Sequence, residues 1–356
     1  MGDEIKGCCS MIPIQNIYYM LSYAFRILRK RGYRNVATEQ FHNVADLCAE
    51  ILIKGVSIQL KRGLGREYIE KTESLSLLRG RIEIVESLKE STKLQNKLVC
   101  SYDDFSVNSY LNRIIKTTMV LLLRADIDKE RKKKLRKLLV FFGDVELLDV
   151  HTINWNIQYH RNNQTYRMLI SICYLVIKGL LQTTTDGTTR LMDFIDDQHM
   201  WRLYETFIFE YFRQEFPRIK VNASNINWAL DDDMSDMLPT MQSDITLTYK
   251  EKVLIIDAKY YRSITLQRYS DPKLRSSHLY QIFTYVKNMD AASSDIPREV
   301  SGMLLYAGTD EQKQPDHTYL MSGNIISVKT LDLNCDFSEV AAQLNKIAEE
   351  HLGVVT

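Results

Sequence analysis

An acidic and a basic side chain stand two residues apart near the end of the apolar run "KVLIIDAKYY", residues 252–261. Alternate side chains of a β-strand lie on the same face, so Asp257 and Lys259 are expected to point the same way. The preceding run "SDITLT" is joined to this one by "YKEK". If the two central residues of that link form the turn, the antiparallel register places Asp244 opposite Asp257.

Two carboxylates that face each other on one side of a sheet repel unless a positive charge lies between them. Mg²⁺, or Mn²⁺ in its place, prefers oxygen ligands, keeps several waters and takes further ligands from a substrate phosphate. Lys259 can orient or help to deprotonate one such water while it faces the phosphate charge. The pattern therefore predicts a metal-dependent site with Asp244, Asp257 and Lys259 as its catalytic residues.

A third carboxylate lies on the apolar stripe of the helix that periodicity predicts over residues 198–216. Glu205 belongs to this stripe rather than to the solvent face, and an acid in such a place needs a reason. One reason is a metal ion at the strand ends, which Glu205 would help to hold. The other is a half-buried ion pair with Arg202.

A second helix, expected over residues 277–289, follows the Asp-x-Lys strand. Gln281 and Tyr285 form an i, i+4 pair along one of its edges, and they fit either a substrate contact or a polar pair of the core. Arg262 and Arg275 lie in the connection that leads to this helix. They are expected to meet a phosphate backbone.

These residues require a sheet flanked by helices in the C-terminal part of the chain. The segment "QTTTDGTTR", residues 182–190, is expected to be a linker because it places turn-forming polar residues between apolar segments. It separates a mainly helical N-terminal domain with small strands, residues 1–190, from an α/β domain with a mixed sheet, residues 191–356. Beyond the two helices above, the second domain is expected to contain a helix over 337–352 and strands over 219–223, 243–248, 252–260, 302–306 and 324–329.

Composition narrows the class of protein. The chain has 356 residues, 26% of them charged, and a formal net charge of +1, so any nucleic acid would be met by local basic patches. Six cysteines without CxxC or zinc-type spacing favour reduced thiols in a cytoplasmic protein. No membrane span is expected, since the most apolar segment, residues 168–181, is short and contains Lys178.

Three further segments have open interpretations. The basic helix predicted from Lys129 to Lys137 is either a solvated face or a surface for nucleic acid or a partner. The aromatic segment from Tyr18 to Phe25 is expected to be a partner surface, with the alternative that Tyr18 and Tyr19 belong to the core. The acidic run "DDDMSD", residues 231–236, lacks the Gly and Glu spacing of a calcium loop and is expected to be an ordinary loop.

The pattern resembles the PD-(D/E)xK nuclease superfamily with a RecB-like extension, although Ser243 stands where the name-giving proline often lies. The residues that carry this resemblance are Glu205, Asp244, Asp257-Ala258-Lys259 and Gln281-x-x-x-Tyr285. The segments "IPIQNIYYMLSYAF", "LLRGRIE", "DDFSVNSYLNRIIKTTM" and "LIIDAKYY" narrow it further. Together they resemble the McrC family, the nuclease subunits of McrBC-type modification-dependent restriction systems, over nearly the whole chain.

The resemblance implies a Mg²⁺- or Mn²⁺-dependent DNA endonuclease that acts only in a complex, in a bacterial or archaeal cytoplasm. Asp244, Asp257, Glu205 and the backbone carbonyl of Ala258 would hold one or two metal ions. The N-terminal domain would dock onto a hexameric McrB-like AAA+ GTPase, so GTP would act only through that partner. The substrate would be double-stranded DNA with modified cytosine, and cutting both strands would need two copies or two successive nicks. The chain contains no G-x-x-x-x-G-K-[ST] phosphate loop, which agrees with a motor on another polypeptide.

Two other functions fit parts of the same pattern. A free-standing repair-type nuclease would use the same residues and cleave DNA with Mg²⁺ alone. A non-catalytic adaptor would only activate a GTPase, an interpretation that the intact set of Asp244, Asp257 and Lys259 weakens.

Overall fold

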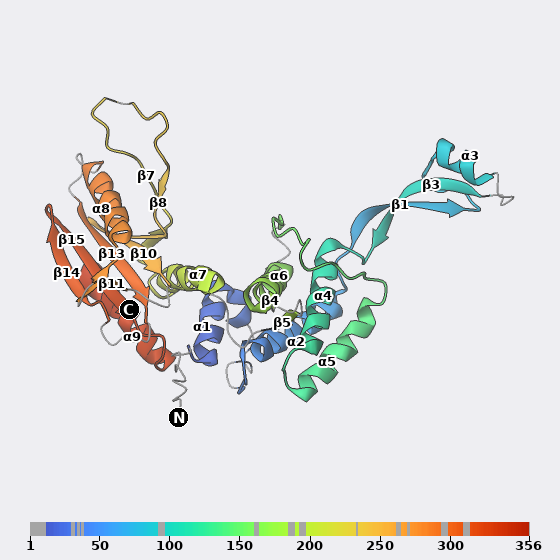
Figure 1. Ribbon diagram of the computed structural model, residues 1–356, viewed down its shortest axis with the longest axis horizontal. Coiled ribbons are helices and arrows are strands. Elements are labelled where there is room, and N and C mark those ends of the chain that lie inside the picture. The colour runs from blue at the N-terminus through green and yellow to red at the C-terminus, as the bar shows by residue number, and fades with distance from the viewer. Residues whose placement is uncertain are drawn as a thin grey trace. The chain divides into compact units, whose positions relative to one another are not determined.

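The computed structural model describes residues 12–29, 33, 36, 39–91, 97–159, 164–183, 189–191, 197–232, 234–260, 265–268, 271–292, 298–308 and 314–355. The chain divides into two compact units (Figure 1). Residues 40–193 form the helical unit, and residues 1–39 together with 194–356 form the sheet unit. The predicted boundary at residue 190 lies near the point where the chain enters the sheet unit for the second time. Residues 1–39 belong to the sheet unit, whereas the prediction of one domain boundary assigned them to the N-terminal domain.

The helical unit contains α2 (Val44–Arg62), α4 (Tyr110–Arg124), α5 (Lys129–Leu139) and α6 (Gln164–Tyr174), with short η3 (Val140–Phe142) and η4 (Leu175–Leu180). Asn43, Ser109 and Asp128 cap α2, α4 and α5 by accepting hydrogen bonds from first-turn N–H groups. The helices bury apolar stripes against one another, and Leu47 and Leu169 are fully buried. This core explains why the periodic apolar segments of the sequence form a compact helical body.

The basic helix α5 is attached to α2 by buried charges. Arg131 Nη1 lies 2.8 Å from Asp46 Oδ2, and Arg131 Nε lies 3.2 Å from Glu50 Oε2. Both acidic side chains are buried, and the Asp128 N–H also donates to Asp46 Oδ1 at 3.0 Å. A buried ion pair requires such additional hydrogen bonds. One cation of the basic run therefore has a structural role.

A three-stranded antiparallel sheet with its own short helix belongs to the helical unit. The sheet has the order β1 (Glu67–Leu75), β3 (Leu98–Ser106), β2 (Arg81–Ile82), and α3 (Ile84–Ser91) contacts β3. We call the described residues of 67–91 and 97–106 the β-arm (Figure 1). Gly80 has a φ of +68°, and a Cβ there would lie 2.3 Å from the Ser101 carbonyl oxygen, so the arm requires glycine at this position.

The predicted linker contains paired strands. β4 (Leu181–Thr183) and β5 (Thr189–Leu191) form an antiparallel pair at the two ends of that segment. Its threonines are turn-compatible but also β-branched, and β-branched residues favour strands. Of the residues between the two strands the structure describes nothing.

The sheet unit is built on a six-stranded mixed sheet with the order β14-β15-β13-β10-β9-β6. These strands are β6 (Lys220–Asn222), β9 (Ile245–Tyr249), β10 (Lys252–Lys259), β13 (Glu299–Ala307), β14 (His317–Met321) and β15 (Asn324–Leu331). β10, β13 and β15 are parallel to one another, whereas β6, β9 and β14 join by antiparallel pairs. The predicted α/β class, with helices N-terminally and a mixed sheet C-terminally, is confirmed.

Helices cover the sheet and fix its strands. α8 (Ser276–Ala291) contacts β10, β13 and β15, and its Ile282 and Val286 share a core with Val253 and Ile255 of β10. α7 (Asp197–Glu215) and α9 (Phe337–Leu352) also contact β10, whose alternate residues Leu254 and Ile256 are fully buried. Because strand side chains alternate between faces, β10 is buried on both sides. Asp257 and Lys259 share the face that α8 covers.

Small strand pairs and the N-terminal helix complete the unit. The pairs are β7 (Asn225–Ile226) with β8 (Met241–Gln242), and β11 (Thr265–Arg268) with β12 (Asp271–Leu274). α1 (Ile14–Ala24), followed by η1 (Arg26–Arg29), packs on α7. Tyr18 and Tyr23 are buried, and the ring of Tyr19 stacks on Phe337 at 4.3 Å. Tyr18 and Tyr19 therefore pack within the sheet unit, in agreement with the alternative interpretation that these two residues belong to the core.

No helix in the described part of the chain combines the length and apolar character that crossing a membrane requires.

Candidate active site

The register of β9 and β10 brings Asp244 and Asp257 together. The ladder pairs Lys252 with Tyr249 and continues to Ile256 with Ile245, which confirms the predicted register. Continued by one residue, the same register sets Asp244 opposite Asp257. β9 ends before that point, and Asp244 Oδ2 instead accepts a hydrogen bond of 3.0 Å from the Ala258 N–H. The Asp244 side chain thus accepts the hydrogen bond that the main chain of β9 would accept if the ladder continued.

Asp257 is a buried carboxylate with unmet hydrogen-bonding capacity. It is 1% exposed, and neither of its carboxylate oxygens has a hydrogen bond. Lys259 Nζ lies 2.9 Å from Asp257 Oδ1, which is ion-pair distance but not a hydrogen-bonding direction. Burial raises the pKa of Asp257 to about 7, while the Lys259 ammonium lowers it and the Asp244 charge raises it. Burial also raises the pKa of Asp244.

A side chain of α8 forms a hydrogen bond with Lys259. Lys259 Nζ donates to Gln281 Oε1 at 3.4 Å, and Gln281 Nε2 donates to the Tyr285 hydroxyl at 3.1 Å. Gln281 and Tyr285 are one helical turn apart, as their i, i+4 spacing requires. The structure therefore joins the predicted pair to the predicted lysine in one chain of hydrogen bonds.

α7 brings Glu205 to the same end of the sheet. Its side chain is half-buried, and burial followed by the Asp244 charge raises its pKa to about 7, while Lys259 and Arg202 lower it. Among the described residues, no three side chains of Asp, Glu, His or Cys lie close enough to form a ready metal cluster. Asp244 and Asp257 thus interact directly with each other, and the Asp244 charge acts on Glu205.

Trp201 lies one turn before Glu205 and contacts the site, although the sequence analysis did not place it there. Its Nε1–H donates to the Ala258 carbonyl oxygen at 3.3 Å. The i, i+4 spacing of Trp201 and Glu205 on one helix face was the available signal. The main-chain N–H and C=O of Ala258, between the predicted aspartate and lysine, are therefore both bound by side chains.

The two predicted arginines differ in placement, and a buried histidine lies near one of them. Arg275 directly precedes α8, and its side chain is half-buried. Arg262 lies outside the described residues. His278 is buried, and its Nδ1 lies 2.8 Å from the hydroxyl of Tyr306 on β13. Burial lowers the pKa of His278 to about 4, and the charges of Lys259 and Arg275 lower it as well.

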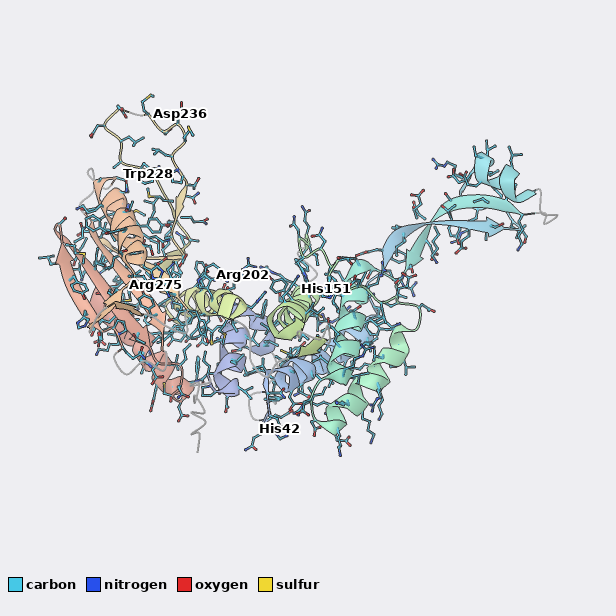
Figure 2. All side chains as sticks on the ribbon, viewed as in Figure 1. His42, His151, Arg202, Trp228, Asp236 and Arg275 are labelled. Carbon is cyan, nitrogen blue, oxygen red and sulfur yellow. The ribbon has the colours of Figure 1, made fainter. Side chains whose placement is uncertain are left out.

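A long loop connects β7 to β8, and β8 ends two residues before Asp244. Figure 2 shows Trp228 and Asp236 in this loop. The Trp228 Nε1–H donates to the Pro239 carbonyl at 2.8 Å, and the Ala229 N–H donates to Asn288 Oδ1 on α8. The acidic run "DDDMSD" lies here without helix or strand in its described residues, as predicted.

The donor set fits a hard divalent cation. Two carboxylates stand in opposed register, one of them buried with both oxygens free of hydrogen bonds, and a carbonyl oxygen lies between Asp257 and Lys259. Oxygen-only donors of this kind suit Mg²⁺ or Mn²⁺ and do not suit zinc, which prefers nitrogen and sulfur. Burial raises the pKa of Asp257 despite the nearby Lys259 ammonium, and a bound cation would offset more of the cost of burying this carboxylate.

Comparison with known proteins identifies the family. The family model described as McrBC 5-methylcytosine restriction system component matches residues 13–307. The chain belongs to this family. The predicted resemblance is thereby confirmed. Within the family, the chain is 29% identical over 350 residues to the type IV methyl-directed restriction enzyme EcoKMcrBC of Escherichia coli strain K12, covering 96% of this chain and 99% of that protein.

Solved structures of McrBC complexes from Thermococcus gammatolerans are also similar. One is a half-complex from a tetradecameric assembly of McrB AAA+ hexamers with bound McrC, at 17% identity and a TM-score of 0.48, over 94% of this chain and 76% of that chain. The other is a cryo-EM structure of the McrBC complex, at 19% identity and a TM-score of 0.39, over 59% and 60%.

Proposed function

We propose that this McrBC family component is the nuclease subunit of its restriction system and hydrolyses phosphodiester bonds of DNA with a divalent cation. The observation that carries the proposal is the Asp257 carboxylate. It is buried without hydrogen bonds, in register with Asp244 and beside Lys259, at the end of a sheet. Burial raises the pKa of this carboxylate despite Lys259, and a perturbed pKa of this kind is typical of a functional site.

Asp244, Asp257, Glu205 and the Ala258 carbonyl would hold Mg²⁺ or Mn²⁺. When bound, the cation supplies charge for the scissile phosphate and lowers the pKa of its water. Lys259 holds its ammonium beside Asp257, where it orients the attacking water and offsets negative charge in the transition state. Gln281 fixes the lysine side chain through Oε1, and Tyr285 fixes the amide of Gln281. A rigid sheet and helix hold these groups more precisely than loops would.

The chain would act with an AAA+ GTPase of the McrB kind, so GTP would be needed through the partner alone. Support comes from the relatives, since one of the Thermococcus structures contains McrB hexamers with bound McrC. The β-arm adds physical support because it exposes many large apolar side chains. They are Tyr68, Leu77, Leu78, Ile82, Ile84, Val85, Leu88, Leu98 and Phe105. An exposed apolar surface of this kind is typical of a protein interface.

The substrate would be double-stranded DNA that contains modified cytosine. The description of the family as a 5-methylcytosine restriction component supports this substrate. Each chain contributes one set of catalytic residues, so a double-strand break needs two copies or two successive nicks. The protein would work in the cytoplasm, where such DNA is met.

The test is cleavage of methylated and unmethylated plasmid by the purified chain with Mg²⁺, with and without the GTPase and GTP. The Asp257→Ala variant is the matched control. Cleavage that requires the partner, GTP and Asp257 is the expected result. Cleavage by the chain alone would instead establish a free-standing nuclease, and stimulation of GTP hydrolysis without cleavage under any condition would contradict the proposal.

A further inference from the structure

Both backbone polar groups of Ala258 are bound by side chains from other elements. The N–H donates to Asp244 Oδ2 at 3.0 Å, and the carbonyl oxygen accepts from Trp201 Nε1 at 3.3 Å. Ala258 itself is fully buried between Asp257 and Lys259. The Trp201 bond is therefore a direct link between α7 and the residue at the centre of the candidate site.

The strand geometry explains why this carbonyl is available. In an antiparallel pair, alternate residues direct both N–H and C=O toward the neighbouring strand. Ile256 faces Ile245 in the last pair of the ladder, and Ala258 points to the same side, where β9 has already ended. A carbonyl oxygen has two acceptor positions, and Trp201 uses one of them. The other position is the one that a cation would use.

The Trp201 hydrogen bond also fixes the position of α7, the helix that contains Glu205. The two residues are one turn apart on α7, so a bond that fixes the indole fixes the position of the turn that follows. Trp201 is the fifth residue of α7 and directly follows the first turn, whose N–H groups have no helical partners. The contact to β10 thus holds Glu205 near Asp244 and Lys259, whose charges act on it.

We propose that Trp201 is a positioning residue for the cation site, because its indole N–H joins α7 to the Ala258 carbonyl and brings Glu205 and that carbonyl to one cation. This inference rests on the proposed function, in which a divalent cation binds at Asp244 and Asp257. Groups that orient metal ligands in this way commonly change metal affinity 10- to 100-fold when they are removed. We expect Trp201→Phe, which keeps the aromatic packing and removes the donor, to weaken Mn²⁺ binding about tenfold.

The experiment measures Mn²⁺ binding to the full chain by calorimetry, without DNA or partner. Trp228→Phe is the matched control, because it removes another indole-to-carbonyl hydrogen bond, to Pro239, in the loop between β7 and β8. The control should bind Mn²⁺ within about twofold of the wild type, and both variants should unfold at similar temperatures in chelator. A Trp201→Phe chain that folds and binds Mn²⁺ as tightly as the wild type overturns the inference.

Asp257→Asn separates the inference from the proposed function. If Asp257→Asn and Trp201→Phe both bind like the wild type, the cation site itself is wrong. If only Asp257→Asn loses binding, the site stands and the role of Trp201 falls. Should Trp201→Phe fail to fold, a chain with Trp155→Phe and Trp228→Phe leaves Trp201 as the fluorophore. Its emission should then change with Mn²⁺ at the calorimetric Kd, and an emission that does not respond overturns the inference.

Discussion

Asp244 Oδ2 accepts a hydrogen bond from the Ala258 N–H at 3.0 Å, at the point where β9 no longer reaches its neighbour. One carboxylate therefore has two tasks. It satisfies a buried backbone donor of β10, and it faces Asp257 across the end of the sheet. The two tasks make different demands, because the first needs an acceptor atom and the second needs a charge.

Substitutions at Asp244 should separate these tasks. Asp244→Asn keeps an acceptor for the Ala258 N–H, so its free energy of unfolding should stay within about 0.5 kcal/mol of the wild type. Asp244→Ala leaves a buried donor unsatisfied and should cost about 1–3 kcal/mol. Both should lose DNA cleavage. Urea unfolding in chelator measures the stabilities, and equal stability of the two variants would show that the hydrogen bond has no structural role.

Asp257→Asn should make the protein more stable at pH 8. The wild-type carboxylate is attracted by the Lys259 ammonium at 2.9 Å, but burial outweighs this attraction and raises its pKa to about 7. Asn removes the buried charge, and Asp244 remains as an anionic neighbour of Lys259. A gain of roughly 1–3 kcal/mol is expected from the desolvation of the charge. Mg²⁺ should raise the Tm of the wild type and leave that of Asp257→Asn unchanged. A variant that is less stable than the wild type in chelator would contradict this account.

Much of the sheet unit was predictable because its signals are local. The α9 range Phe337–Leu352 matches the predicted helix over 337–352, and the short link between β9 and β10 determined the register that pairs Asp244 with Asp257. Hydrophobic periodicity and a tight turn depend on neighbouring residues alone. The same is true of the i, i+4 relation between Gln281 and Tyr285. These elements needed no knowledge of the rest of the chain.

Features that depend on distant contacts were not predictable. Asn16 donates to the Leu333 carbonyl, and Tyr23 donates to Glu215, so α1 belongs to a unit that the chain enters again only after residue 193. The contact between Trp201 and Ala258 likewise joins residues that are far apart in sequence. Arg131 looked like one of many surface cations until its buried acidic partners on α2 were known.

His278 should make stability depend on pH. Its pKa is about 4 in the folded protein, below the ordinary 6.5, because it is buried near Lys259 and Arg275 and beside Tyr306. Between pH 6.5 and 4 the unfolded chain binds a proton that the folded chain does not, so stability falls as the pH falls through this window. The loss is complete below about pH 4 and absent above about pH 7.

The comparison with His278→Gln isolates that effect, because the raised pKa of Asp257 and of Glu205 acts in the opposite direction over part of the same range. The stability difference between wild type and variant should shift by on the order of 2–3 kcal/mol in favour of the variant between pH 7 and pH 4. Chemical unfolding at several pH values measures it. A difference that does not change with pH would mean that His278 takes up its proton in the folded state as readily as in the unfolded chain.

The β-arm offers the sharpest test of the proposed partner surface. Leu77 and Leu78 are 83% and 63% exposed, so replacing both with serine should change the Tm by less than about 2 °C. If the arm docks onto the GTPase, the double variant should lose most of the stimulation of GTP hydrolysis, because buried leucines at an interface contribute through the apolar area they remove from water. Mn²⁺ affinity should not change.

Phe141→Ser, which alters a 64% exposed side chain elsewhere in the helical unit, is the control and should stimulate GTP hydrolysis normally. Normal stimulation by the double variant would show that Leu77 and Leu78 are not part of the docking surface.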